Sequence, residues 1–112
     1  MEATENVGCR LNLSVDEACY KRPFEELVQR VIILLEEGNR EIDLCFPKDI
    51  PCSGQDYALR WSSFKTFEFP DGPPIHCKPI DALTGILKNE GYFANSHYTS
   101  ENPDRIRLTF RG

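Results

Sequence analysis

Apolar side chains recur at helical spacing in two segments of the chain. The first segment covers residues 24–37, and the second, residues 79–90, has a narrower stripe made of Ile80, Leu83, Ile86 and Leu87. Each segment has a proline at its start, acidic residues in its first turn and a glycine just after its end. These patterns predict two amphipathic helices, each followed by a glycine in the left-handed conformation.

Other parts of the chain alternate between apolar and polar residues, which is the pattern of a strand with one buried face. Such alternation predicts strands in residues 11–15, 42–46, 92–99 and 105–111, the last two joined as a hairpin. Residues 57–69 also alternate around Ser62 and Ser63. They are consistent with one long strand containing a bulge or with two strands joined by a tight turn.

The order of these elements predicts an α+β fold. Two helices with one apolar stripe each are best buried on one face of a single sheet. We therefore expect a two-layer sandwich with a mainly antiparallel sheet of about five or six strands and two helices on one face, ferredoxin-like or related. Residues 1–112 should form one globular domain, with residues 1–7 frayed. Gly85, inside the second helix, suggests close packing on a neighbour.

Composition and charge narrow the classes of function. The net charge is −5, which argues against duplex DNA or an anionic membrane as a partner. No apolar run approaches the length of a membrane span, and the acidic N-terminus does not resemble a signal peptide. The five cysteines have no regular spacing, so we expect reduced thiols and a cytoplasmic or nuclear location.

Cysteine and histidine chemistry has two candidates. A zinc site could draw on Cys45, Cys52, His76 and Cys77, but these residues lack the paired spacing of structural zinc ligands. Cys52 could instead be a nucleophile activated by His76 or His97, although no catalytic signature accompanies them. The glycines stand singly, which excludes a glycine-rich nucleotide loop. We predict no metal, no cofactor and no catalytic site.

The last strand carries the most distinctive polar residues. If Ile106 and its alternate neighbours point inward, then Arg105, Arg107 and Arg111 project from the opposite face of the sheet. Beside Tyr98 or Tyr92, three cations in a row suit either the phosphates and bases of single-stranded RNA or the carboxylates of a protein partner. They are also typical of a solvated strand face that charge protects from edge-to-edge aggregation.

Three functions remain as hypotheses. The first is a small non-enzymatic intracellular protein interaction module, an adaptor, regulatory protein or complex subunit. It would bind another protein or a second copy of itself through an open sheet face or an edge strand. Its expected binding residues are Arg105, Arg107, Arg111, Tyr98 and Trp61, residue types that often anchor interfaces. The alternative is an RNA-binding or single-stranded nucleic-acid-binding module, and the third hypothesis is a Cys/His-dependent enzyme.

Overall fold

A computed structural model describes residues 9–47, 57–98, 101 and 104–111 of the chain. Its elements, in chain order, are β1 (Cys9–Asn12), α1 (Val15–Ala18), α2 (Glu25–Glu36), β2 (Glu41–Cys45), α3 (Tyr57–Ser63), α4 (Pro79–Asn89), β3 (Ala94–His97) and β4 (Arg105–Phe110). The fold is α+β, as the sequence predicts. The prediction that residues 1–7 are frayed lies outside the described residues.

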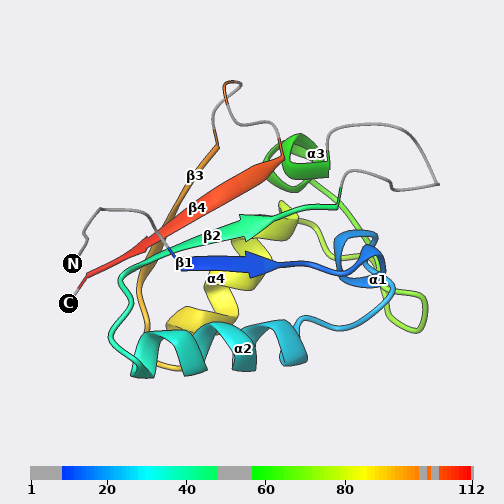
Figure 1. The fold of residues 1–112 in the computed structure, drawn as a ribbon. Helices are drawn as coiled ribbons and strands as arrows, with labels where there is room; N and C mark the ends of the chain where they lie inside the picture. Colours follow the sequence, from blue (N-terminus) through cyan, green and yellow to red (C-terminus); the bar gives the residue numbers. More distant parts are fainter. Residues whose placement is uncertain (1–8, 48–56, 99–100, 102–103, 112) are drawn as a thin grey trace.

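The described strands form one mixed sheet in the order β1-β2-β4-β3 (Figure 1). β1 runs parallel to β2, whereas β2 and β3 both pair antiparallel with β4. The prediction of five or six mainly antiparallel strands is therefore met only loosely by the four-stranded mixed sheet. The chain also departs from the β-α-β-β-α-β order of a ferredoxin-like fold, because α3 and α4 separate β2 from β3.

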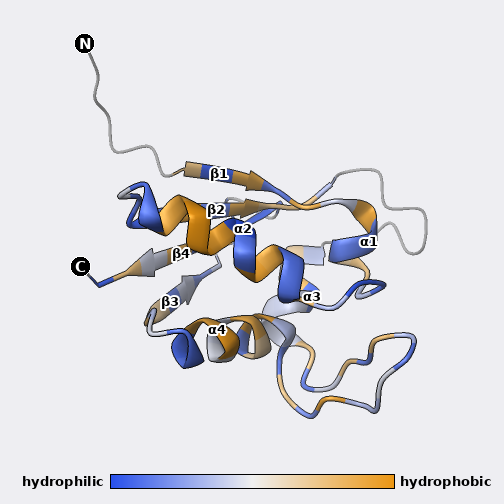
Figure 2. Cartoon of the chain, turned by 90° about the horizontal axis from the view of Figure 1, so that it is seen from below, coloured by the Kyte–Doolittle hydropathy of each residue, from blue (hydrophilic) through white to orange (hydrophobic). Residues whose placement is uncertain are grey.

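The two predicted helices are confirmed as α2 and α4, which form a layer on one face of the sheet (Figure 2). Both helices end as predicted, because Gly38 and Gly91 have positive φ angles of 103° and 95°. Ile33 lies outside the buried apolar stripe of α2, since 53% of its surface remains exposed. The core lies between these helices and the sheet face formed by Leu11, Ile42, Leu44, Ile106, Leu108 and Phe110.

Two segments predicted as strand or connection are helical. Residues 57–63 form α3, in which Tyr57, Ala58 and Trp61 are buried while Leu59 is exposed. Apolar residues at 57 and 61 fit a helix as well as a strand, so alternation alone did not distinguish the two. Farther along, Phe67 makes only an isolated bridge with Ile75. Val15–Ala18, taken as the end of a strand and a connection, is α1, which Ser14 begins with a capping box.

An aromatic cluster joins α3 to the start of α2. Trp61 is fully buried, and its indole Nε1 donates a hydrogen bond to the carbonyl oxygen of Ala18 at 3.0 Å. The rings of Phe24 and Tyr20 lie 5.1 and 6.0 Å from that of Trp61, between ring centroids. Trp61 therefore stabilises the core. The structure does not place it on the surface, where the interface hypothesis needs it.

Candidate functional site

The face of the sheet opposite the helices is polar. Cross-strand pairing aligns Arg10 with Asp43 and Arg107 with both Asp43 and His97, and paired residues project from the same face. This row crosses all four described strands. Arg105 lies on the same face, paired with Cys45. Arg105 and Arg107 of the predicted arginine strand therefore project from the face that the described helices leave open (Figure 2).

Asp43 occupies the centre of this open face with only 1% of its surface exposed. The guanidinium of Arg107 donates two hydrogen bonds to its carboxylate, 2.8 Å from Nε to Oδ1 and 3.3 Å from Nη2 to Oδ2. The hydrogen bond to Asp43 raises the pKa of Arg107 above its ordinary value. Arg105 approaches the same carboxylate at 3.9 Å, and Arg107 also lies 3.7 Å from Glu41. Carboxylates of the chain itself therefore neutralise these two predicted binding residues.

The remaining sequence candidates are dispersed. Tyr98 is partly buried against the core, and His97 lies within 3.1 Å of the hydroxyl of Thr109. Burial raises the pKa of the Cys45 thiol, which disfavours a reactive thiolate there. Cys52, required by both the zinc and the nucleophile hypotheses, lies outside the described residues. Within the described ranges, no three His, Cys, Asp or Glu side chains are placed to hold a metal ion.

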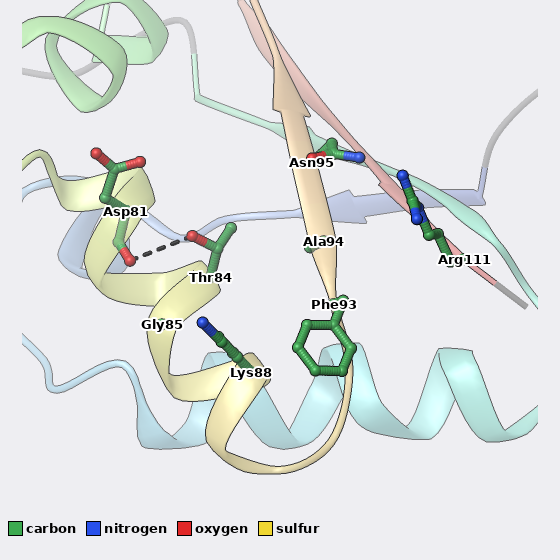
Figure 3. A pocket seen from close by; sticks show the side chains of 8 residues that line it. All are labelled: Asp81, Thr84, Gly85, Lys88, Phe93, Ala94, Asn95 and Arg111. Atoms are coloured by element: carbon green, nitrogen blue, oxygen red, sulfur yellow. Dashed lines mark hydrogen bonds between the residues drawn. The ribbon is translucent and has the colours of Figure 1, made fainter.

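A groove of about 490 Å³ runs between α4 and β3, the last strand of the sheet (Figure 3). One wall is a single face of α4, formed by residues at spacings of three and four, a spacing that places them in one line along the helix. The other wall comes from the segment around β3 and the residue that follows β4. The lining residues are Asp81, Thr84, Gly85, Lys88, Phe93, Ala94, Asn95 and Arg111.

The backbone of β3 leaves hydrogen-bonding groups unused along this groove. Phe110 donates its N–H to Arg40 on the β2 side, so the pair of Phe110 and Ala94 is one that does not exchange hydrogen bonds. The pair of Leu108 and Ser96, two residues along, has the same geometry. Ala94 and Ser96 therefore direct their N–H and C=O groups away from β4. No other strand in the described part of the chain pairs with that edge.

Three side chains of the groove are exposed in an unusual combination. Phe93 is 58% exposed, the highest value among the large apolar residues of the described ranges that remain on the surface. The ammonium group of Lys88 is directed away from Phe93 along α4, whereas Arg111 lies beside Asn95 on the other side of β3 (Figure 3). Neither cation has an ion-pair partner among the described residues, unlike Arg105 and Arg107. Arg111 is thus the one predicted arginine that lines the groove.

Gly85 lies on the helix wall of the groove. A Cβ atom built at this position would meet nothing within 4 Å. The prediction that Gly85 marks close packing on a neighbour is therefore wrong. A glycine inside a helix costs about 1 kcal/mol relative to alanine. No contact within the described chain accounts for that cost, but the glycine does keep the groove wide.

Sequence reasoning missed Lys88, Phe93 and the use of Gly85. The available signal was Phe93, which follows Gly91 and Tyr92 and precedes the partly buried Ala94. In an alternating strand Phe93 points to the face opposite that of Ala94, so its large apolar ring is directed toward solvent. The position of α4 beside β3 depends on the tertiary structure and had no sequence signal.

Comparisons with known proteins identify no relative. No family model matches the chain, and neither the curated proteins nor the solved structures include a significant match. None of the helices in the described ranges has the length and apolarity needed to cross a membrane. A functional proposal therefore depends on the geometry of the chain itself.

Proposed function

We propose that this chain is a small non-enzymatic protein interaction module that binds an extended segment of a partner protein at the edge of β3. The observation that carries the proposal is the unpaired edge of β3 beside the groove formed with α4. An extended peptide that joins a sheet edge gains main-chain hydrogen bonds, and neighbouring pockets select its side chains.

The lining of the groove supports this mode of binding. The outward N–H and C=O groups of Ala94 and Ser96 supply two positions for main-chain pairing. Phe93 offers an exposed apolar contact, and the missing side chain at Gly85 leaves space for one from the partner. A long unpaired edge strand promotes aggregation of a soluble protein. β3 has only four residues, so its free edge is short.

The open sheet face is less suitable than this edge for either partner that the sequence suggested. Arg105 and Arg107 already contact Asp43, so a new ligand would have to compete with an internal carboxylate. The same argument weakens the RNA hypothesis. The irregular spacing of the five cysteines in the sequence supports the proposed cytoplasmic or nuclear location.

Amide exchange can test strand addition directly. Random twelve-residue peptides displayed on phage would first be selected on the immobilised chain, and the best binder synthesised. Binding should slow hydrogen exchange at the amides of Ala94 and Ser96, because these point outward. Asn95 and His97, whose amides face β4, should change little. Protection confined to Arg105 and Arg107 would instead place the ligand on the open face and refute the proposal.

Two substitutions provide matched controls. Ser96→Pro removes one outward N–H without removing a hydrogen bond to β4, and it should abolish binding, whereas Ser96→Ala should not. Gly85→Leu should fill the groove and block binding while raising the melting temperature, because leucine favours the helix. Retained affinity in both Ser96→Pro and Gly85→Leu would exclude the β3 edge. Protection of the same amides without peptide, rising with protein concentration, would show that a second copy occupies the edge instead.

A further inference from the structure

The charges around the groove indicate which segment it selects. Lys88 lies on the α4 side of β3, and Arg111 lies on the opposite side, beside Asn95 (Figure 3). Asp81 is at the other end of the helix wall, seven residues or about 10 Å from Lys88 along the helix axis. The groove therefore has one cation on each side of β3 and a carboxylate at the Asp81 end of its helix wall (Figure 3).

Lys88 and Arg111 would contact opposite faces of a strand added beside β3 (Figure 3). Successive side chains of a strand point to opposite faces of the sheet. In a segment paired with β3, one residue would point toward the side of α4 and Lys88, and its neighbour would point toward the side of Arg111 (Figure 3). Both cations lack an internal partner among the described residues, so both remain available to a ligand.

On the basis of the proposed function, we infer that the groove selects an extended segment with two adjacent carboxylates, one on each face of the added strand. One carboxylate interacts with Lys88 and the other with Arg111. Two adjacent acidic side chains of the partner supply this chemistry. The part of the segment that lies beside Asp81 is neutral or basic, since Asp81 would repel another carboxylate.

Display selection tests this inference. The same random twelve-residue library would be selected on the wild type and on the double variant Lys88→Glu with Arg111→Glu. We expect adjacent acidic residues among the wild-type binders and basic residues at those positions among binders of the double variant. The control Lys21→Glu with Lys65→Glu changes the net charge equally at exposed lysines outside the groove, and it should select the same acidic sequences as the wild type.

Synthetic peptides then distinguish the sources of the carboxylates. For the best wild-type binder, each acidic residue would be replaced by its amide, and the C-terminus would be prepared as acid and as amide. Each carboxylate that contacts a cation should contribute about fivefold in affinity, the upper range for an exposed ion pair. Losses confined to the side chains assign both contacts to acidic residues, as inferred, whereas a fivefold loss on amidating the C-terminus would overturn that assignment.

The outcomes separate this inference from the proposed function. Binders with no acidic preference that still protect Ala94 and Ser96 would overturn the inference and leave strand addition intact. Selection of acidic sequences by the charge-reversed variant would overturn the inference in the same way. If neither protein selected any peptide above background, both the inference and the proposed function would be refuted.

Discussion

Asp43 shows, at the scale of one residue, that the environment of a side chain in the fold can differ from the one its sequence pattern predicts. In the sequence it alternates with buried neighbours and resembles a solvated acid. In the structure it is almost fully buried beneath Arg107 and Arg105. A buried carboxylate requires charged or hydrogen-bonding partners, so these arginines have a structural role on the open face.

The substitution Arg107→Ala should therefore destabilise the fold. We expect the free energy of unfolding in urea to fall by about 2 kcal/mol, because the carboxylate of Asp43 loses two charge-assisted hydrogen bonds while buried. The sequence alone predicts instead that all three arginines are exposed and that their removal leaves the stability of the fold unchanged. Adding Asp43→Asn should recover part of the loss.

Arg111→Ala is the matched control for that experiment. Arg111 is exposed and has no ion-pair partner among the described residues, so its removal should change the stability by less than about 0.5 kcal/mol. Equal losses for Arg107→Ala and Arg111→Ala would contradict the assigned role of Arg107.

At the scale of elements, Arg30 of α2 joins three neighbouring segments. Its Nη1 donates to both carboxylate oxygens of Glu17 in α1, at 2.8 and 2.7 Å, and its Nη2 donates to the backbone oxygen of Asn12 in β1 at 2.7 Å. Glu17 also accepts the backbone N–H of Ser14 as part of the capping box. A helix of one turn is not stable alone, so these contacts hold α1 in place.

The pKa of Glu17 makes this junction sensitive to acid. Burial raises its pKa, but hydrogen bonds from Ser14 and Arg30 together outweigh burial, and the pKa lies below the ordinary value of 4.5. Its contribution to stability is therefore complete above about pH 4.5 and is lost as the pH falls through the folded-state pKa. Urea unfolding of the wild type and Glu17→Gln should differ most near neutral pH and converge in acid. A difference that stays constant down to about pH 3 would disprove this linkage.

At the scale of the whole molecule, charge separates the protein and RNA hypotheses. The chain carries a net charge of −5, and Arg105 and Arg107 lie beside Asp43, Glu41 and Asp104. A surface that binds a polyanion needs cations that are free to contact phosphates. The open face is close to electrically balanced, which favours a protein partner with a local charge pattern.

A fluorescently labelled twenty-nucleotide oligouridine should therefore bind weakly or not at all at about 0.15 M salt. Fluorescence anisotropy between low and physiological salt would measure this. Micromolar binding whose affinity falls by about 0.7 log units per log unit of salt for each contacted phosphate would instead favour the RNA hypothesis. Loss of that slope in Arg105→Ala with Arg111→Ala would identify the surface involved, since this variant keeps the bond between Arg107 and Asp43.

Local signals in the sequence determined the parts of this protein that depend on neighbouring residues. The amphipathic stripes, the first-turn acids and the terminal glycines were sufficient to place α2 and α4 within a residue or two. Strict alternation was sufficient for β2 and β4, including which side chains of β4 face the core. In α2, α4 and β4 a single periodicity fits the buried positions, so sequence and structure agree, whereas in β2 the polar Asp43 is buried as well as its apolar neighbours.

Only the tertiary structure decided the remaining features. Residues 57–63 satisfy both periodicities, and the burial of Trp61 against Ala18 selects the helix. The parallel pairing of β1 with β2 and the location of β3 at the sheet edge depend on contacts between distant residues. The groove has the same origin, because Gly85, Phe93 and Arg111 acquire a shared surface only when α4 packs beside β3. Local sequence determines whether each segment is helical or extended, whereas burial between segments determines which segments pack together.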